Sequence, residues 1–169
     1  LYAHMFDQAV FPAEMIGPLV EVAGGNPLYA HEYVRMLIEQ GFLHRLGRGW
    51  TLSRPQELPI PDSVHSVIAN RIDLLDPADR AVLLTASVVG SQFWPGAIAA
   101  ALGQPVEAVE RSLRRLEQSD FVHEESSSSM AGQAEFRFGH VLVRDVCYQR
   151  LPRTERVTRH ERTADWLDE

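Results

Sequence analysis

His140 stands where a strand pattern changes into a helix pattern, a position suited to binding an anion. Phe136 and Phe138 alternate with polar neighbours, as in a half-buried strand, and Gly139 ends the alternation. From Leu142 onward the apolar residues follow a helical period. Free backbone N–H groups at a helix start attract phosphate. His140 is therefore a candidate phosphate ligand, and a helix cap is an equally good interpretation of a lone histidine here.

Arg144 follows His140 by four residues, which places both on one face of the expected helix. A guanidinium there could add a second contact to phosphate. Pairing of Arg144 with Asp145, or with another surface carboxylate, is the interpretation that we favour.

A second candidate is the segment Gly25-Asn26-Pro27, which separates two helix patterns. Gly24 and Gly25 end the first pattern. Asparagine is a preferred helix cap and proline a preferred first helical residue, so this local role explains the whole segment. The Pro27 ring would also present a rigid apolar face with no N–H that needs a partner.

Other polar groups in the sequence give little support for catalysis. His31 and Glu32 have no second histidine or cysteine at helical spacing, which argues against zinc. The serines at 126–129 lack a histidine–acid pair that would activate a nucleophile. A series of arginines at three-residue steps is interrupted by acidic residues and favours a solvated face. This series comprises Arg150, Arg153, Arg156, Arg159 and Arg162.

Composition narrows the function classes. The 169 residues suffice for one ordinary domain or two small ones. All 16 basic residues are arginines, and without lysine the chain has no Walker A loop, so we expect no enzyme activity from this segment. The net charge of −7 argues against general affinity for nucleic acid. No apolar run is long enough for a bilayer, and Cys147, the single cysteine, indicates a cytoplasmic protein.

Two blocks are expected, residues 1–58 and residues 59–169, joined by a proline-rich connection at 55–61. In the first block, Ile16, Leu19, Val20 and Ala23 share one helical face. A second helix begins after Asn26 and closes at Gly41, and the segment 42–52 reads as a small hairpin.

The second block is expected to be helical with a small two-stranded wing. Asp62 is the expected cap of a helix that reaches Leu75, and Asp76-Pro77 starts the next. Two further helices, two strands around a flexible serine-rich tip, and two terminal helices complete it. The ranges are 95–102 and 105–118 for the helices, and 121–124 and 135–138 for the strands.

The region from Phe136 to Leu167 resembles the end of the winged-helix domain in bacterial signal-transduction ATPases of the STAND class. Those proteins place a methionine-histidine-aspartate motif before a leucine-hydrophobic-arginine-aspartate helix. The tetrapeptide at 142–145 matches the helix motif and puts His140 on the motif histidine, whereas Gly139 replaces methionine and Val141 replaces aspartate. The downstream series is similar to the branch that includes LuxR-type regulators and cyclase fusions. It comprises Tyr148, Leu151, Arg156, His160, Ala164 and Leu167.

Gly25-Asn26-Pro27 also resembles the glycine-any-proline motif of the lid domain in that class, and the likeness extends from about Phe11 to Leu167. It implies a mainly α fold, with a small helical lid domain followed by a winged-helix domain. It implies that Pro27 packs on adenine and that His140 contacts the β-phosphate of ADP. The nucleotide-binding residues would be Gly25, Asn26, Pro27, His140 and Arg144.

The same likeness implies particular partners. ATP or ADP would be held by a P-loop ATPase core upstream in the same polypeptide, and a helical-repeat or effector domain would follow downstream. The isolated segment is expected to bind no nucleotide.

Two alternatives remain at this point, a DNA-binding regulator segment and a nucleotide-independent interaction scaffold. For DNA, the reading helix would span 105–118, where Glu107 and Glu110 would meet negative phosphates. Glu124 and Glu125 lie beside a wing tip that lacks basic residues. The sequence therefore argues against DNA binding by this segment.

Overall fold

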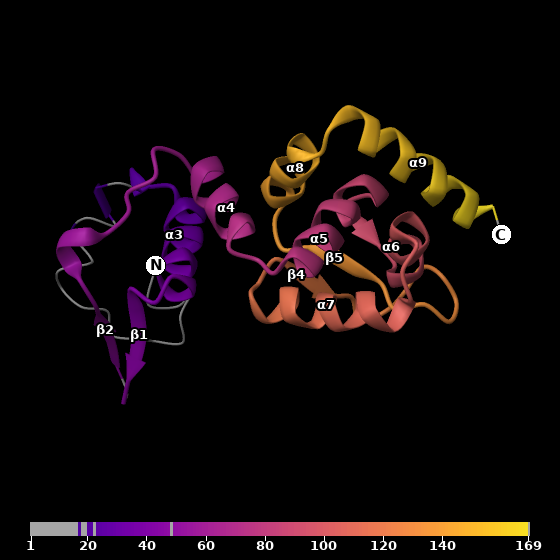
Figure 1. Cartoon of the computed structure of the whole chain (residues 1–169). Helices are drawn as coiled ribbons and strands as arrows, with labels where there is room; N and C mark the ends of the chain where they lie inside the picture. Colours follow the sequence, from indigo (N-terminus) through magenta and orange to yellow (C-terminus); the bar gives the residue numbers. More distant parts are fainter. Residues whose placement is uncertain (1–16, 18–19, 22, 48, 169) are drawn as a thin grey trace. The chain divides into compact units, whose positions relative to one another are not determined.

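The chain forms two compact units, residues 1–74 and residues 75–169, in the computed structural model (Figure 1). The structure describes residues 17, 20–21, 23–47 and 49–168. Within these residues the fold is mainly helical with one two-stranded and one three-stranded sheet, which confirms the predicted fold class.

Within residues 26–74 of the first unit, the structure describes two helices, a hairpin and a short 3₁₀ turn. Its elements are α3 (Pro27–Glu39), β1 (Leu43–Leu46), β2 (Gly49–Leu52), the 3₁₀ turn η1 (Pro55–Glu57) and α4 (Val64–Asp73). Strands β1 and β2 pair antiparallel, with Leu43 opposite Leu52, so the predicted hairpin is confirmed. Apolar side chains of α3 form the core together with Leu43 and Val67.

Helix α4 packs against α3, so the division between the units falls after Leu74 rather than after residue 58. Val67, Ile68 and Ile72 recur at helical spacing and are all buried, and Val67 belongs to the core of the first unit. The predicted cap, Asp62, is wrong by one residue. Ser63 caps the helix, and its Oγ accepts a hydrogen bond from the Ser66 N–H at 3.2 Å.

The first predicted helix is only partly described. Ile16 and Leu19 lie outside the described residues, whereas Val20, Glu21 and Ala23 are helical. Gly24 and Gly25 follow with φ of +53° and +82°, a conformation that glycine adopts without steric cost. The predicted helix stop is therefore confirmed.

The second unit alternates helices with short strands. Its elements are α5 (Pro77–Val89), β3 (Gln92–Phe93), α6 (Pro95–Leu102), α7 (Val106–Gln118), β4 (Val122–Glu124), β5 (Phe136–Phe138), α8 (Val141–Arg150) and α9 (Arg153–Leu167). The sheet has the antiparallel order β3-β5-β4. Helices α5, α6 and α7 and the strands β4 and β5 lie where the sequence predicted helices and a two-stranded wing, and β3 is an additional strand. Two residues are too short to show alternation, which explains why the sequence did not reveal β3.

Aromatic rings fill the space between the sheet and the helices. Phe93 packs against Phe136 and Phe138, with ring centroids 6.3 and 5.2 Å apart. An ion pair joins α5 to α7, because the Arg115 guanidinium donates to both carboxylate oxygens of Asp79 at 2.5 and 2.8 Å. Burial raises the pKa of Asp79, but hydrogen bonds from Arg115 and Ser112 outweigh it and leave that pKa below its usual value.

The serine-rich wing tip is tied to the sheet, which differs from the flexible tip expected. The buried carboxylate of Glu135 accepts hydrogen bonds from the N–H and the hydroxyl of Ser129 at 2.7 and 2.6 Å. The Ser128 hydroxyl lies 3.5 Å from the same oxygen. These donors hold the pKa of Glu135 below its usual value, the Ser129 hydroxyl contributing most.

None of the helices described by the structure is long and apolar enough to cross a membrane.

Candidate functional site

The start of α3 carries three of the predicted site residues. The Asn26 side chain accepts hydrogen bonds from the N–H groups of Leu28 and Tyr29 at 3.0 and 3.2 Å, so it caps the helix as predicted. Pro27 occupies the first helical position, and Gly25, Asn26 and Pro27 are all exposed. The cap fixes the backbone on both sides of Pro27, so the ring presents a rigid apolar surface to solvent.

Two tyrosines anchor the helix behind this surface. Tyr29 donates its hydroxyl hydrogen to the Pro61 carbonyl at 2.7 Å, and its ring stacks on Tyr33 with centroids 5.8 Å apart. Burial, with a smaller contribution from Asp62, raises the pKa of Tyr29. Burial raises the pKa of Tyr33 to about 12. Both phenols are therefore neutral donors near neutral pH.

A buried ion cluster joins α3 to α4. Arg71 is 1% exposed, and its guanidinium donates to Glu32 and to both carboxylate oxygens of Glu39, the latter at 2.6 to 3.1 Å. Burial opposes the charge, but the hydrogen bonds and charges of the two carboxylates outweigh it and raise the pKa of Arg71. Glu32 is thus a partner of arginine. Burial of Arg71 could have been predicted from the sequence, because position 71 shares a helical face with the apolar residues Val67 and Ile68.

The junction between β5 and α8 requires a glycine at position 139. A Cβ there would lie 2.8 Å from the backbone oxygen of Asp120 and 3.3 Å from the His123 ring. The Gly139 N–H also donates to the Phe121 carbonyl at 2.9 Å. This close approach gives a physical reason for a glycine at position 139.

His140 caps α8. Its Nδ1 accepts a hydrogen bond from the Leu142 N–H at 3.1 Å, and the residue has extended backbone and is exposed. Because Nδ1 acts as acceptor, the neutral ring carries its proton on Nε2. The cap interpretation is therefore confirmed, and it leaves Nε2–H as a donor for a ligand.

Arg144 lies one turn further along α8 and has local partners. Its guanidinium is 3.5 Å from the Asp145 carboxylate, the pairing that we favoured, and its Cζ lies 5.8 Å from the centre of the Tyr148 ring. Arg156 of α9 approaches the same ring at 4.8 Å, and the Tyr148 hydroxyl lies 3.3 Å from Nε2 of His160. Arg144 therefore belongs to an aromatic and cationic cluster where α8 meets α9.

The predicted site residues fall into two groups. Gly25, Asn26 and Pro27 lie together in the first unit, and His140 and Arg144 lie one turn apart in the second. Sequence reasoning missed Arg71 and the pocket that α9 forms with α6. Within the residues that the structure describes, no group of three or more histidine, cysteine, aspartate or glutamate side chains is placed to hold a metal ion.

Comparison with family models, with curated proteins and with solved structures found no match for this chain.

Proposed function

We propose that this chain is the regulatory part of a nucleotide-switched signal-transduction ATPase. In this proposal the first unit acts as a lid, the second acts as a winged helix, and both close over ADP or ATP bound to a P-loop core outside this chain. The observation that carries the proposal is the state of His140, an exposed cap whose remaining ring nitrogen is a hydrogen-bond donor.

The chemistry of His140 suits an oxyanion. Its Nε2–H can donate to a phosphate oxygen while Nδ1 continues to cap α8. The N-terminal end of α8 adds positive partial charge beside the ring. The cap already orders the His140 ring. A β-phosphate that binds Nε2–H would therefore cost little additional side-chain entropy.

Pro27 supports the other half of the proposal. A purine needs a flat or rigid apolar surface, and the exposed pyrrolidine ring at the capped start of α3 provides one. The ring brings no N–H that would lose a partner when a base covers it. Tyr29 and Tyr33 hold the helix behind it, so the surface is preformed.

The surface of α7 gives less support to the alternative function, sequence-specific binding of DNA. Glu107, in its first turn, is exposed, and this is the part of the helix that would approach the bases. Arg115 is bound to Asp79 rather than available to a phosphate backbone. Glu124 is exposed at the end of β4, next to the wing.

A switch follows from differential contacts. If Pro27 and His140 both contact ADP, the closed arrangement is favoured by the sum of the two contacts. ATP adds a charged γ-phosphate beside the diphosphate, and any loss of the His140 contact would shift the population toward an open arrangement. The open form would expose surfaces for assembly or for an effector domain.

The test uses the protein that includes the coding region immediately upstream. The proposal expects a glycine-rich lysine loop there, and co-purified ADP in the product. His140→Ser should retain the cap, since serine is a preferred N-cap residue, but should lose the phosphate donor. Nucleotide released on denaturation is then quantified for the wild type, His140→Ser and the matched surface variant His65→Ser.

Reduced ADP retention in His140→Ser alone, with unchanged thermal unfolding, would support the proposal. Equal retention in all three proteins would refute it and favour an interaction scaffold, in which His140 has only its capping role.

A further inference from the structure

A pocket of about 390 Å³ lies between the end of α6 and residues 154–162 of α9, within the second unit. This volume is within the usual range for small-ligand sites. Ala101 and Leu102 of α6 line one side of it. None of the residues considered above as nucleotide contacts takes part in it.

The spacing of residues in α9 explains the polar side of the pocket. Thr154, Thr158 and Arg162 follow one another at four-residue steps, and Glu155 and Arg159 form the adjacent row. Both rows line the pocket together with Ala101 and Leu102 of α6. The arginine series, which was predicted to form a solvated face, is thus divided. Two of its members, Arg159 and Arg162, line the pocket.

Arg159 is held in position at the pocket wall. Its guanidinium donates to Glu155 at 2.7 Å and to the Thr85 hydroxyl of α5 at 2.9 Å, and its side chain is only 15% exposed. A guanidinium has five N–H donors in a rigid fork, so two contacts leave donors for a ligand.

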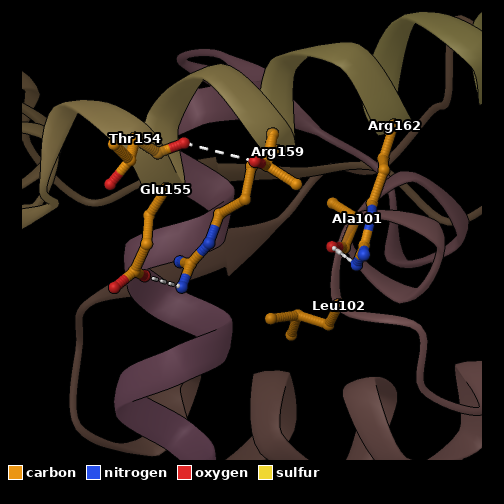
Figure 2. A pocket seen from close by; sticks show the side chains of 7 residues that line it. Ala101, Leu102, Thr154, Glu155, Arg159 and Arg162 are labelled. Atoms are coloured by element: carbon orange, nitrogen blue, oxygen red, sulfur yellow. Dashed lines mark hydrogen bonds and ion pairs between the residues drawn. The ribbon is translucent and has the colours of Figure 1, made fainter.

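Arg162 is held by α6. It donates to the Ala101 carbonyl at 3.1 Å, one of the last carbonyls of that helix. Figure 2 shows the Arg159 and Arg162 side chains extending from α9, with Leu102 between their guanidinium groups in this view. A ligand in the pocket would thus meet two cations and an apolar surface together.

The docking of α9 keeps this arrangement rigid. The Trp166 ring stacks on Trp94, with centroids 6.4 Å apart, and it covers Gly96 so closely that a Cβ there would lie 2.7 Å from the ring. Because Trp166 fixes α9 beside the pocket, little entropy is lost when a ligand binds.

We propose that this pocket binds a small organic anion, a carboxylate or phosphate monoester with a compact apolar body. Its charged side chains are Arg159, Arg162 and Glu155, which give a net charge of +1 from two positive groups and one negative group. Arg162, which is exposed and has one hydrogen bond to a carbonyl, is the main anchor. Arg159 and the Thr154 hydroxyl add donors, and Leu102 contacts the apolar body. This site is independent of the nucleotide proposal.

The experiment titrates this chain with phenyl phosphate, with benzoate and with neutral benzyl alcohol, and follows the arginine Nε–H signals by NMR. We expect saturable shifts of the Arg159 and Arg162 signals with one or both anions, with a Kd of about 1 mM or tighter. The two anions distinguish phosphate from carboxylate recognition. Benzyl alcohol should give no saturable shift, since it lacks the charge.

Arg162→Ala should weaken anion binding by about tenfold or more. Arg153→Ala is the matched control, because it removes an exposed arginine of the same helix outside the pocket. Arg162→Lys keeps the positive charge but lacks the planar set of guanidinium donors. This variant therefore separates loss of anion recognition from loss of folding. Absence of saturation with both anions, or equal weakening by Arg153→Ala, would overturn the proposal.

Discussion

Replacement of Arg71 by methionine should strongly destabilise the first unit. The Arg71 side chain is 0% exposed and that of Glu32 is 4% exposed, so the substitution leaves a carboxylate with no cation and little water. Glu39 is 22% exposed and can turn toward solvent, which limits the cost to one stranded charge. Breaking a buried pair by removing one partner costs about 3–5 kcal/mol, and we expect about 3 kcal/mol here.

The assay is urea unfolding followed by the fluorescence of Trp50, which lies in the first unit. Trp94 and Trp166, the other two of the chain's three tryptophans, are replaced by phenylalanine so that only this unit is reported. Arg45→Met is the matched control. Arg45 is exposed on β1, and its loss should change the free energy of unfolding by less than about 0.5 kcal/mol.

A triple variant separates the stranded charge from simple loss of packing. Adding Glu32→Gln and Glu39→Gln to Arg71→Met should recover part of the stability, because a neutral amide costs less to bury than a carboxylate. A loss below about 1 kcal/mol for Arg71→Met, typical of an exposed pair, would refute the reasoning. So would a triple variant less stable than Arg71→Met alone.

Three further predictions concern the second unit. The folded pKa of Glu135 is lowered by Ser129, so its carboxylate stabilises the fold above the ordinary glutamate pKa and ceases to do so as pH falls through the folded value. The Tm of Glu135→Gln should therefore lie below that of the wild type at neutral pH, with the difference vanishing on acidification. Gly139→Ala should cost about 1–3 kcal/mol in urea unfolding, because its Cβ would lie 2.8 Å from the Asp120 oxygen. An unchanged midpoint would contradict this. Burial raises the pKa of Cys147 to about 12, so a thiol reagent at neutral pH should label it only on unfolding, and rapid labelling of the folded chain would contradict the burial.

Local signals made much of the fold predictable. Gly24 and Gly25 mark a helix stop, Asn26 and Pro27 a helix start, and the alternation around Phe136 a strand. Each depends on a few neighbouring residues, so backbone preference and periodicity were sufficient. The hairpin of the first unit and the helices of the second followed in the same way.

Contacts between residues far apart in the sequence were harder to predict. Helix α4 was assigned to the wrong block because periodicity shows that a helix has an apolar face but not which element covers it. The pairing of Arg71 with Glu32 and Glu39 spans more than thirty positions of sequence. Strand β3 has two residues and exists only because β5 supplies its partner.

In the candidate sites, too, the sequence predicted the local features, whereas features that depend on distant residues needed the structure. The cap by Asn26 and the helix start at Pro27 could be predicted from the local sequence. The tautomer of His140 needed the position of the Leu142 N–H, which only the structure gives. The pocket beside α9 needed α6, because the arginines of an isolated helix give no indication of which ones are covered.

The most direct test of the nucleotide switch is the distance between its two candidate contact regions. Cysteines replace Glu21 beside the Pro27 segment and Gln149 on α8, both exposed, in the protein that includes the upstream core. Native Cys147 is buried and should stay unlabelled, so spin labels would report only the two chosen positions. With ADP, the account predicts one short, narrow distance distribution that lengthens or broadens when ADP is removed or exchanged for ATP. A distribution that is the same in all three nucleotide states would contradict it.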